Sequence, residues 1–304
     1  MATRKRKLPS YKDFKIKRTI KHPISKPIPS VLGLLFDTWK QMWKYKKLFF
    51  SVILITLVLN IVLVKGFASG INMPEIKQQL QQVGLTPGIA FNTTILGLVV
   101  AGANSNLSEV ASVYQSILTI ISCLAFIWLF RQTYDAKKKV SIRVKDPFYE
   151  GMAPVIPFIL QLMLMSLQLL PMVIGLGLFG IVQANGLAVT ALEISIWVIF
   201  LILMIIWGFY LVSGSFLSLI IVTLPDMTPI KAYKMSKKVI EFRRLIVLRK
   251  LLFFLILFLI IIGGVMLLFI MVIPNLAEWV WLGLSSLILP VVIGSGYRLY
   301  RSLL

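Results

Sequence analysis

The feature that most constrains this chain is a series of apolar runs without charge, several of which reach the length that crosses a bilayer. A helix needs about 20 such residues to span the hydrocarbon core. A soluble α/β core would show apolar runs of only about 4–8 residues. Composition agrees, since 58% of the residues are hydrophobic and 14% are charged, against roughly 25% charged residues in soluble domains. The pattern therefore predicts an all-α membrane protein.

Six of the apolar runs are long enough to be transmembrane helices. The predicted spans cover residues 48–64, 113–130, 153–182, 194–212, 251–273 and 279–297. Pro171 lies inside the third span, where proline is expected to kink the helix. The apolar run 187–224 would be about 57 Å long as one helix. We therefore predict that the fourth span ends near Val212, with a turn or a break at Ser213-Gly214-Ser215.

The remaining residues divide into a tail and connections. Residues 1–29 are basic and rich in proline, so we predict a disordered cytoplasmic tail. Residues 30–304 then form a single six-helix membrane domain. The apolar segment 88–103 is short and interrupted, which favours an interfacial or re-entrant segment over a span. Asn106, three residues before Glu109, is typical of a capping box at the start of the next helix.

The positive charges predict the orientation. Of the 32 lysines and arginines, all but Lys65 and Lys77 fall in residues 1–47, 131–150, 226–250 and 298–304. These four segments lie on one side of a six-span topology. Cytoplasmic loops carry the excess of lysine and arginine, so both termini are predicted to be cytoplasmic. The expected location is the plasma (cytoplasmic) membrane, in a multi-pass arrangement.

Two basic segments have the periodicity of amphipathic helices. From Ser30 onward one helix face would carry large apolar residues, with lysines opposite or following: Leu32, Leu35, Phe36, Trp39, Met42 and Trp43. This pattern favours a helix lying in the membrane interface, and the alternative is a soluble helix packed on a partner. In residues 226–250, lysines alternate with apolar residues in the same way.

The two amphipathic segments also suggest an internal repeat. In each, a proline (Pro29 or Pro229) precedes a basic helix, and a lysine (Lys47 or Lys250) leads into a span. Spans one and five would then be equivalent. Lysine before leucine and phenylalanine is a common membrane entry, so the alternative is a chance likeness.

The apolar cores of the spans contain no ionisable residue, which argues against a proton-coupled carrier, a voltage sensor or an intramembrane aspartyl protease. Their neutral polar residues either form interhelical hydrogen bonds or line a substrate path. The candidate polar lining is Asn60, Gln115, Gln161, Gln168 and Ser215. Gln161 and Gln168 are seven residues apart and share a helix face. Glycines expected to allow close helix approach are Gly175, Gly177, Gly180, Gly263 and Gly264. Gly294 and Gly296 would either do the same or bend the end of span six.

The basic clusters beside the spans are candidate contacts for anionic lipid headgroups. They are Arg4, Lys5, Arg6, Lys7, Lys137, Lys138, Lys139, Lys237, Lys238, Arg243 and Arg244. The alternative is a topology signal with a solvated tail. Nucleic acid is a less favoured partner, because no aromatic stacking platform accompanies the basic runs.

One segment resembles a known group. Residues 228–239 contain Pro229, Ala232 and Ser236 in a Pro-x-x-Ala-x-x-x-Ser pattern before a span. This resembles poorly characterised prokaryotic six-helix membrane proteins, including the membrane domain attached to some glycerophosphodiester phosphodiesterases. The resemblance covers about 25 residues, and Glu241-Phe242-Arg243 stands where the group often has a glycine. It implies only a bacterial membrane domain of unsettled role, and the activity of the soluble phosphodiesterase domain is not carried over.

No catalytic, metal or cofactor motif is recognisable. The single histidine, His22, lies in the basic tail, and the single cysteine, Cys123, lies within an apolar run. We therefore expect a non-enzymatic scaffold or accessory component of the cell envelope that contacts the lipid bilayer and a membrane-protein partner. The alternatives are a transporter or lipid-translocating permease with a neutral polar lining, and a less favoured intramembrane lipid enzyme.

Overall fold

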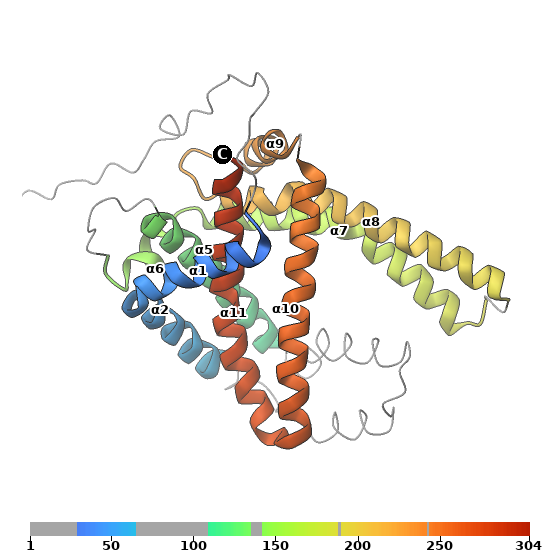
Figure 1. Cartoon of the computed structure of the whole chain (residues 1–304), viewed down its shortest axis with the longest axis horizontal. Coiled ribbons are helices and arrows are strands. Elements are labelled where there is room, and N and C mark those ends of the chain that lie inside the picture. Colours follow the sequence, from blue (N-terminus) through green and yellow to red (C-terminus); the bar gives the residue numbers. More distant parts are fainter. Residues whose placement is uncertain (1–28, 65–108, 135–141, 188–189, 242) are drawn as a thin grey trace, which may run out of the picture. The chain divides into compact units, whose positions relative to one another are not determined.

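In the computed structural model, the described residues are 29–64, 109–134, 142–187, 190–241 and 243–304, and their regular elements are all helices (Figure 1). The elements are α1 (Val31–Lys44), α2 (Lys46–Leu59), η2 (Asn60–Val64), α5 (Glu109–Tyr134), α6 (Asp146–Glu150), α7 (Val155–Ala184), α8 (Ala191–Ile221), α9 (Pro229–Ile240), α10 (Arg244–Val272) and α11 (Pro274–Leu303). Residues 1–28 of the predicted tail 1–29, the segment 88–103 and Asn106 lie outside the described residues.

Six helices in the described part of the chain are long and apolar enough to cross a membrane. The candidate spans are Lys46–Leu63, Val113–Tyr134, Val155–Gln183, Ala191–Ile221, Arg244–Val272 and Trp279–Leu303. The predicted all-helical class and the six spans are confirmed. The helices fit a multi-pass integral membrane protein.

The predicted turn or break in the fourth span is wrong, because α8 runs without interruption through Ser213-Gly214-Ser215 to Ile221. Serine does not stop the helix here, since its hydroxyl can bond to a carbonyl one turn earlier. Ser213 Oγ donates to the Tyr210 carbonyl oxygen at 2.8 Å. At the other end, the Thr190 side chain and Glu193 form a capping box that starts α8.

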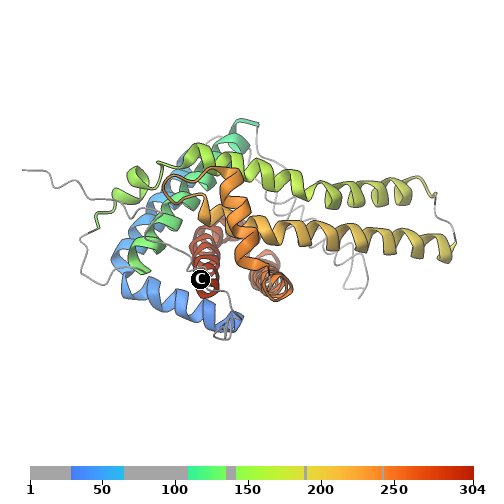
Figure 2. The same ribbon diagram turned by 90° about the horizontal axis from the view of Figure 1, so that it is seen from above.

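The chain divides into two compact units. The first contains Pro154–Leu252, Gly296–Leu304 and Pro29, and the second contains residues of Ser30–Ala153 and Phe253–Ser295. In the first unit, α7 and α8 form a hairpin whose helices run side by side (Figure 2). Its turn contains Gly186, which has a positive φ of 59° and ends α7 as glycine commonly does.

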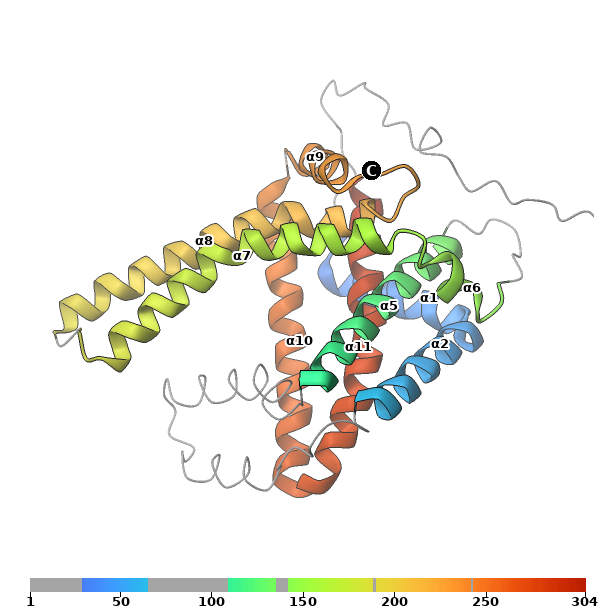
Figure 3. The same ribbon diagram turned by 180° about the vertical axis from the view of Figure 1, so that it is seen from behind.

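The α7–α8 hairpin is closely packed at two glycines that face methionines. A Cβ added at Gly175 of α7 would lie 2.7 Å from Met204 Cβ, and one at Gly208 of α8 would lie 3.0 Å from Met172 Cβ. The predicted close approach is confirmed at Gly175. At Gly177, Gly180, Gly263 and Gly264, an added Cβ would meet none of the described residues within 4 Å, so the structure shows no close approach there. Figure 3 shows α7 bending along its course, and the helix contains Pro171.

In the second unit, α2 and α5 contact each other (Figure 3), with the Phe49 and Phe130 rings 4.9 Å apart. Gly294 of α11 packs here: an added Cβ would lie 2.4 Å from Phe130 Cζ and 2.5 Å from Thr38 Cγ2. Gln41 Nε2 of α1 donates to Thr133 Oγ1 of α5 at 2.7 Å. The close approach expected at Gly294 is therefore confirmed.

Candidate functional site

Polar side chains from α7 and α8 meet in one interhelical row, which we call the polar seam (Gln161, Gln168, Ser215 and Ser218). Gln161 Nε2 donates to Ser218 Oγ at 2.5 Å, and Ser215 Oγ donates to Gln168 Oε1. Gln161, Ser215 and Ser218 are fully buried. The seam thus gives two polar crosslinks to a hairpin that is otherwise held by apolar contacts.

The short helix α9 is held on α8 beside the polar seam. Ala232, Ser236 and Ile240 form its buried stripe, with at most 1% of each residue exposed. Ser236 Oγ donates to the Gly214 carbonyl oxygen of α8. A Cβ added at Gly214 would lie 3.8 Å from the Tyr233 ring, so the absence of a side chain at Gly214 lets α9 approach the α8 backbone.

Arg244, the first residue of α10, makes a second attachment to the same turn of α8. Its Nη2 donates to the Tyr210 carbonyl oxygen at 2.6 Å, and its Nε donates to Ser213 Oγ at 3.4 Å. The guanidinium carbon also lies 3.6 Å from the centroid of the Tyr210 ring, a cation–π contact. The ends of the segment from α9 to α10 are therefore both fixed to residues 210–214.

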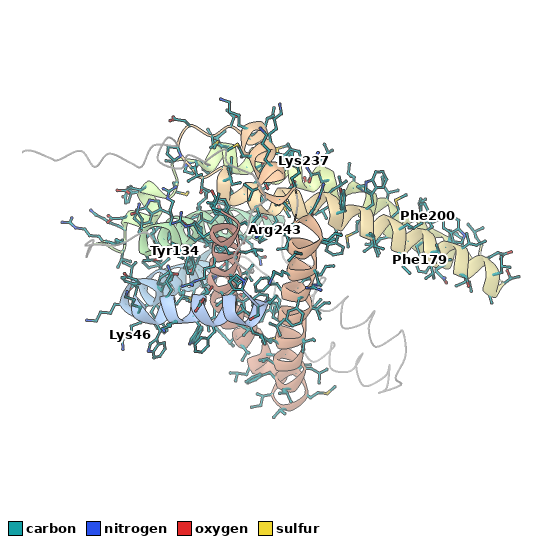
Figure 4. All side chains as sticks on the ribbon, turned by 45° about the horizontal axis from the view of Figure 1, so that its top comes forward. Lys46, Tyr134, Phe179, Phe200, Lys237 and Arg243 are labelled. Atoms are coloured by element: carbon teal, nitrogen blue, oxygen red, sulfur yellow. The ribbon has the colours of Figure 1, made fainter. Side chains whose placement is uncertain are left out.

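The opposite side of α9 carries positive charge. Its four exposed lysines are Lys231, Lys234, Lys237 and Lys238. At 100° per residue, Lys231, Lys234 and Lys238 lie on the far side of the helix from the buried stripe, and Lys237 lies on the flank next to them. Figure 4 shows Lys237 and Arg243 at the same end of the α7–α8 hairpin, away from Phe179 and Phe200. Because the buried stripe is fixed, the lysines are presented as one oriented face.

Helix α1 has a different exposed face. Its buried stripe consists of Leu34, Thr38, Gln41 and Met42. Large apolar residues are exposed on the opposite side: Leu32, Phe36, Trp39 and Trp43. The Trp39 and Trp43 rings are stacked with centroids 6.4 Å apart, and Lys46 Nζ lies 5.7 Å from the centroid of the Trp43 ring.

Three residues of the predicted polar lining (Gln161, Gln168 and Ser215) come together in the polar seam. The other two lie in the second unit. Asn60 Nδ2 donates to the Thr56 carbonyl oxygen of its own helix at 3.0 Å, and Gln115 is half-buried on α5.

Of the predicted lipid contacts, Lys237 and Lys238 are exposed on α9, while Arg243 and Arg244 are half-buried beside it. Arg244 is engaged with α8 as described above. The remaining predicted contacts lie outside the described residues: Arg4, Lys5, Arg6, Lys7, Lys137, Lys138 and Lys139.

Sequence reasoning missed the packing role of Ala232, Ser236 and Gly214. The signal that could have found it was the Pro-x-x-Ala-x-x-x-Ser pattern itself, because positions i and i+4 lie on one helix face and both residues are small. The pairing of Arg244 with Tyr210 had no comparable signal in the sequence.

Among the described residues, no three side chains of histidine, cysteine, aspartate or glutamate cluster as metal ligands would. Cys123 is a free thiol on α5. Comparison of the chain with sequence models of protein families, with curated proteins and with solved structures finds no match.

Proposed function

We propose that this protein is a non-enzymatic, multi-pass component of the cytoplasmic membrane that binds anionic lipid headgroups through α9 and thereby organises other envelope components. Both termini would be cytoplasmic, as the distribution of lysine and arginine predicts. The observation that carries the proposal is the packing of α9, which buries one stripe of residues against α8 and leaves four lysines exposed.

Electrostatics supports an anionic surface as the partner of α9. Each lysine or arginine near such a surface contributes about 1 kcal/mol. Four lysines on one face could then contribute about 4 kcal/mol, or about a thousandfold in affinity. A fixed helix loses little conformational entropy on binding, which favours this surface over a mobile tail of equal charge.

The exposed residues of α1 support an interfacial position for that helix. Tryptophan and lysine side chains are typical of helices that lie at the level of the headgroups. Only Tyr45 separates α1 from α2, the first candidate span, so the end of α1 is adjacent to the end of a membrane helix. The proposed lipid contact of α9 is the basis for a scaffold role.

The test uses the lipid that remains bound to the protein when it is extracted in polymer-bounded nanodiscs. A variant in which Lys231, Lys234, Lys237 and Lys238 are all glutamine should retain at least about tenfold less phosphatidylglycerol per protein than the native chain. The matched variant with arginine at the same four positions keeps the charge and should retain the native amount. Equal retention by all three proteins would overturn the proposal.

A change of topology could imitate the loss of binding, because these lysines also contribute to the positive-inside signal. Labelling of a cysteine placed at Lys234, in a Cys123→Ser background, reports the side of the membrane that α9 occupies. The lipid measurement is interpreted on variants in which that side is unchanged.

A second candidate is a permease with a neutral polar path. The observation that favours it is Gln161 Oε1, which is buried and accepts no hydrogen bond from the described residues. Such an oxygen is costly unless a polar partner reaches it. If a path exists, a cysteine at Gln161 in the Cys123→Ser background should react with a water-soluble methanethiosulfonate. If the cysteine at position 161 does not react at all, the polar seam serves only to pack α7 against α8.

A further inference from the structure

Two short helices lead into candidate spans in the same way, and we call each, with the start of its span, an elbow. The first elbow is residues 30–50, which comprises α1 and the start of α2. The second elbow is residues 228–248, which comprises α9 and the start of α10. Figure 1 shows α1 and α9 as separate short helices.

The elbows share one register, in which Ser30 corresponds to Thr228, a shift of 198 positions. Ser30 Oγ accepts from the Gly33 backbone N–H at 3.1 Å. Thr228 Oγ1 accepts from the Lys231 backbone N–H at 3.4 Å. Both contacts are N-caps that reach three residues ahead. This register replaces the looser match of Pro29 to Pro229 that the sequence suggests.

The buried residues follow the same register. The corresponding pairs are Leu34 with Ala232, Thr38 with Ser236, Met42 with Ile240, and Phe49 with Val247, and every member is buried. The central hydroxyl residue of each stripe meets a glycine of a long helix. Thr38 packs against Gly294 of α11, and Ser236 donates to the Gly214 carbonyl oxygen of α8. The two elbows are therefore attached to the protein by equivalent faces.

The exposed residues are where the elbows differ. Leu32 corresponds to Ile230, and the two are 63% and 62% exposed. At three further exposed positions the first elbow is aromatic where the second is charged: Phe36 against Lys234, Trp39 against Lys237, and Trp43 against Glu241. Asp37 and Lys40 of the first elbow are exposed as well, and Lys40 corresponds to Lys238. The two elbows are thus packed onto the protein in the same way, but one exposes aromatic side chains where the other exposes charged ones.

We propose that the two elbows bind the same bilayer surface by different means. The first inserts the side chains of Phe36, Trp39 and Trp43 at the boundary between headgroups and acyl chains. The second holds anionic headgroups electrostatically through its lysines. This inference rests on the proposed function for the second elbow and adds a distinct, salt-independent anchor in the first.

The continuity of the exposed surface argues for lipid as the occupant of the first elbow. The exposed apolar residues of α1 are followed on α2 by exposed Phe50, Leu54 and Val58, and on η2 by exposed Val62, spaced four residues apart. A helix face with that spacing on a candidate span faces acyl chains or another helix. The lysines beside Trp43, with Lys46 over its ring, add the cations typical of an anionic interface.

The test compares corresponding positions in the full-length protein. Trp39→Cys and Lys237→Cys, each in the Cys123→Ser background, are labelled with the fluorophore NBD and reconstituted into phosphatidylcholine vesicles with or without phosphatidylglycerol. At position 39 we expect blue-shifted emission and quenching by nitroxide-labelled acyl chains. Quenching by iodide should be several-fold weaker there than at position 237. High salt should change none of these three signals at position 39. At position 237, protection from iodide should require phosphatidylglycerol and disappear at high salt.

Equal exposure of both positions to iodide would overturn the inference, as would loss of the signal at position 39 in high salt. Shielding of position 39 from both iodide and nitroxide lipid would also overturn it, because a protein partner would then cover the face. If the retention of anionic lipid still depends on the α9 lysines in that case, the proposed function stands and only the first elbow is reassigned.

A second measurement uses substitutions that replace aromatic side chains of the first elbow by the lysines of the second. Phe36→Lys with Trp39→Lys changes only exposed residues of α1 and leaves its buried stripe intact. A label at Trp43→Cys in that protein should become several-fold more sensitive to salt and to phosphatidylglycerol than in the parent. An unchanged, salt-independent signal would contradict the assignment of the aromatic face as the anchor.

Discussion

Substituting Gly294 by alanine should destabilise the protein, because the added methyl group has no space. Its Cβ would lie 2.4 Å from Phe130 Cζ and 2.5 Å from Thr38 Cγ2, whereas carbon atoms pack at about 3.5–4.0 Å. Phe130 and Thr38 are both fully buried, and the Phe130 ring already contacts Phe49. At least one of these side chains must move by about 1 Å.

The magnitude follows from two opposing contributions. Overpacking a filled core costs about 1–3 kcal/mol, and the site belongs at the upper end because two buried neighbours are displaced. Alanine regains up to about 1 kcal/mol over glycine in a helix. We therefore expect Gly294→Ala to lower the free energy of unfolding by about 1–2 kcal/mol, or about 5- to 30-fold in the unfolding equilibrium.

The assay is equilibrium unfolding in mixed micelles titrated with sodium dodecyl sulfate. Gly283→Ala is the matched control, because Gly283 lies in the same helix and an added Cβ there would meet no atom of the described residues within 4 Å. Thr38→Ser removes Cγ2 but keeps the hydroxyl group, so it should recover at least about 0.5 kcal/mol of the loss in the Gly294 variant. Stability of Gly294→Ala equal to that of Gly283→Ala would refute the packing of α1 on α11.

Three further predictions concern α7, α8 and α9. Gly175→Ala brings a Cβ within 2.7 Å of Met204 and should destabilise the hairpin in the same assay, whereas Gly177→Ala should not. Ser236→Ala removes a buried hydrogen bond and should cost about 1 kcal/mol, with faster tryptic cleavage at the α9 lysines. Arg244→Lys keeps the charge but loses the planar fork that reaches both acceptors and the ring. Arg244→Lys should therefore also speed tryptic cleavage at the α9 lysines. An unchanged cleavage rate would argue against the attachment of Arg244 to α8.

The existence of the six spans could be predicted from the sequence because run length in an uncharged segment is a strong, local constraint. The C-terminal end of α8 could not. The prediction assumed that no helix extends far beyond the bilayer thickness. In the structure, Ser213 Oγ bonds to a carbonyl oxygen within α8, Ser215 Oγ bonds to Gln168 of α7, and Ser236 of α9 bonds to the Gly214 carbonyl oxygen. Tertiary contact, which a hydropathy pattern does not contain, decides where that helix ends.

The candidate site was only partly predictable, for the same reason. Gln161 and Gln168 could be placed on one face of α7 by their spacing, and the structure pairs them with Ser218 and Ser215. Gly208 was missed, because the need for glycine there comes from close packing against a methionine on another helix. The two elbows show this most clearly: their exposed residues are visible in the sequence, while their common register appears only when the buried residues are known.

The central claim is that the lysine face of α9 lies against anionic headgroups, and photocrosslinking tests it directly. The full-length protein is reconstituted with a phosphatidylglycerol that carries a photoactivatable group at its headgroup, and crosslinked peptides are identified by mass spectrometry. The account predicts crosslinks concentrated in residues 230–243 that decrease at high salt and fall several-fold in the four-glutamine variant. Crosslinks that avoid α9, or that are unchanged by salt and by loss of the lysines, would contradict it.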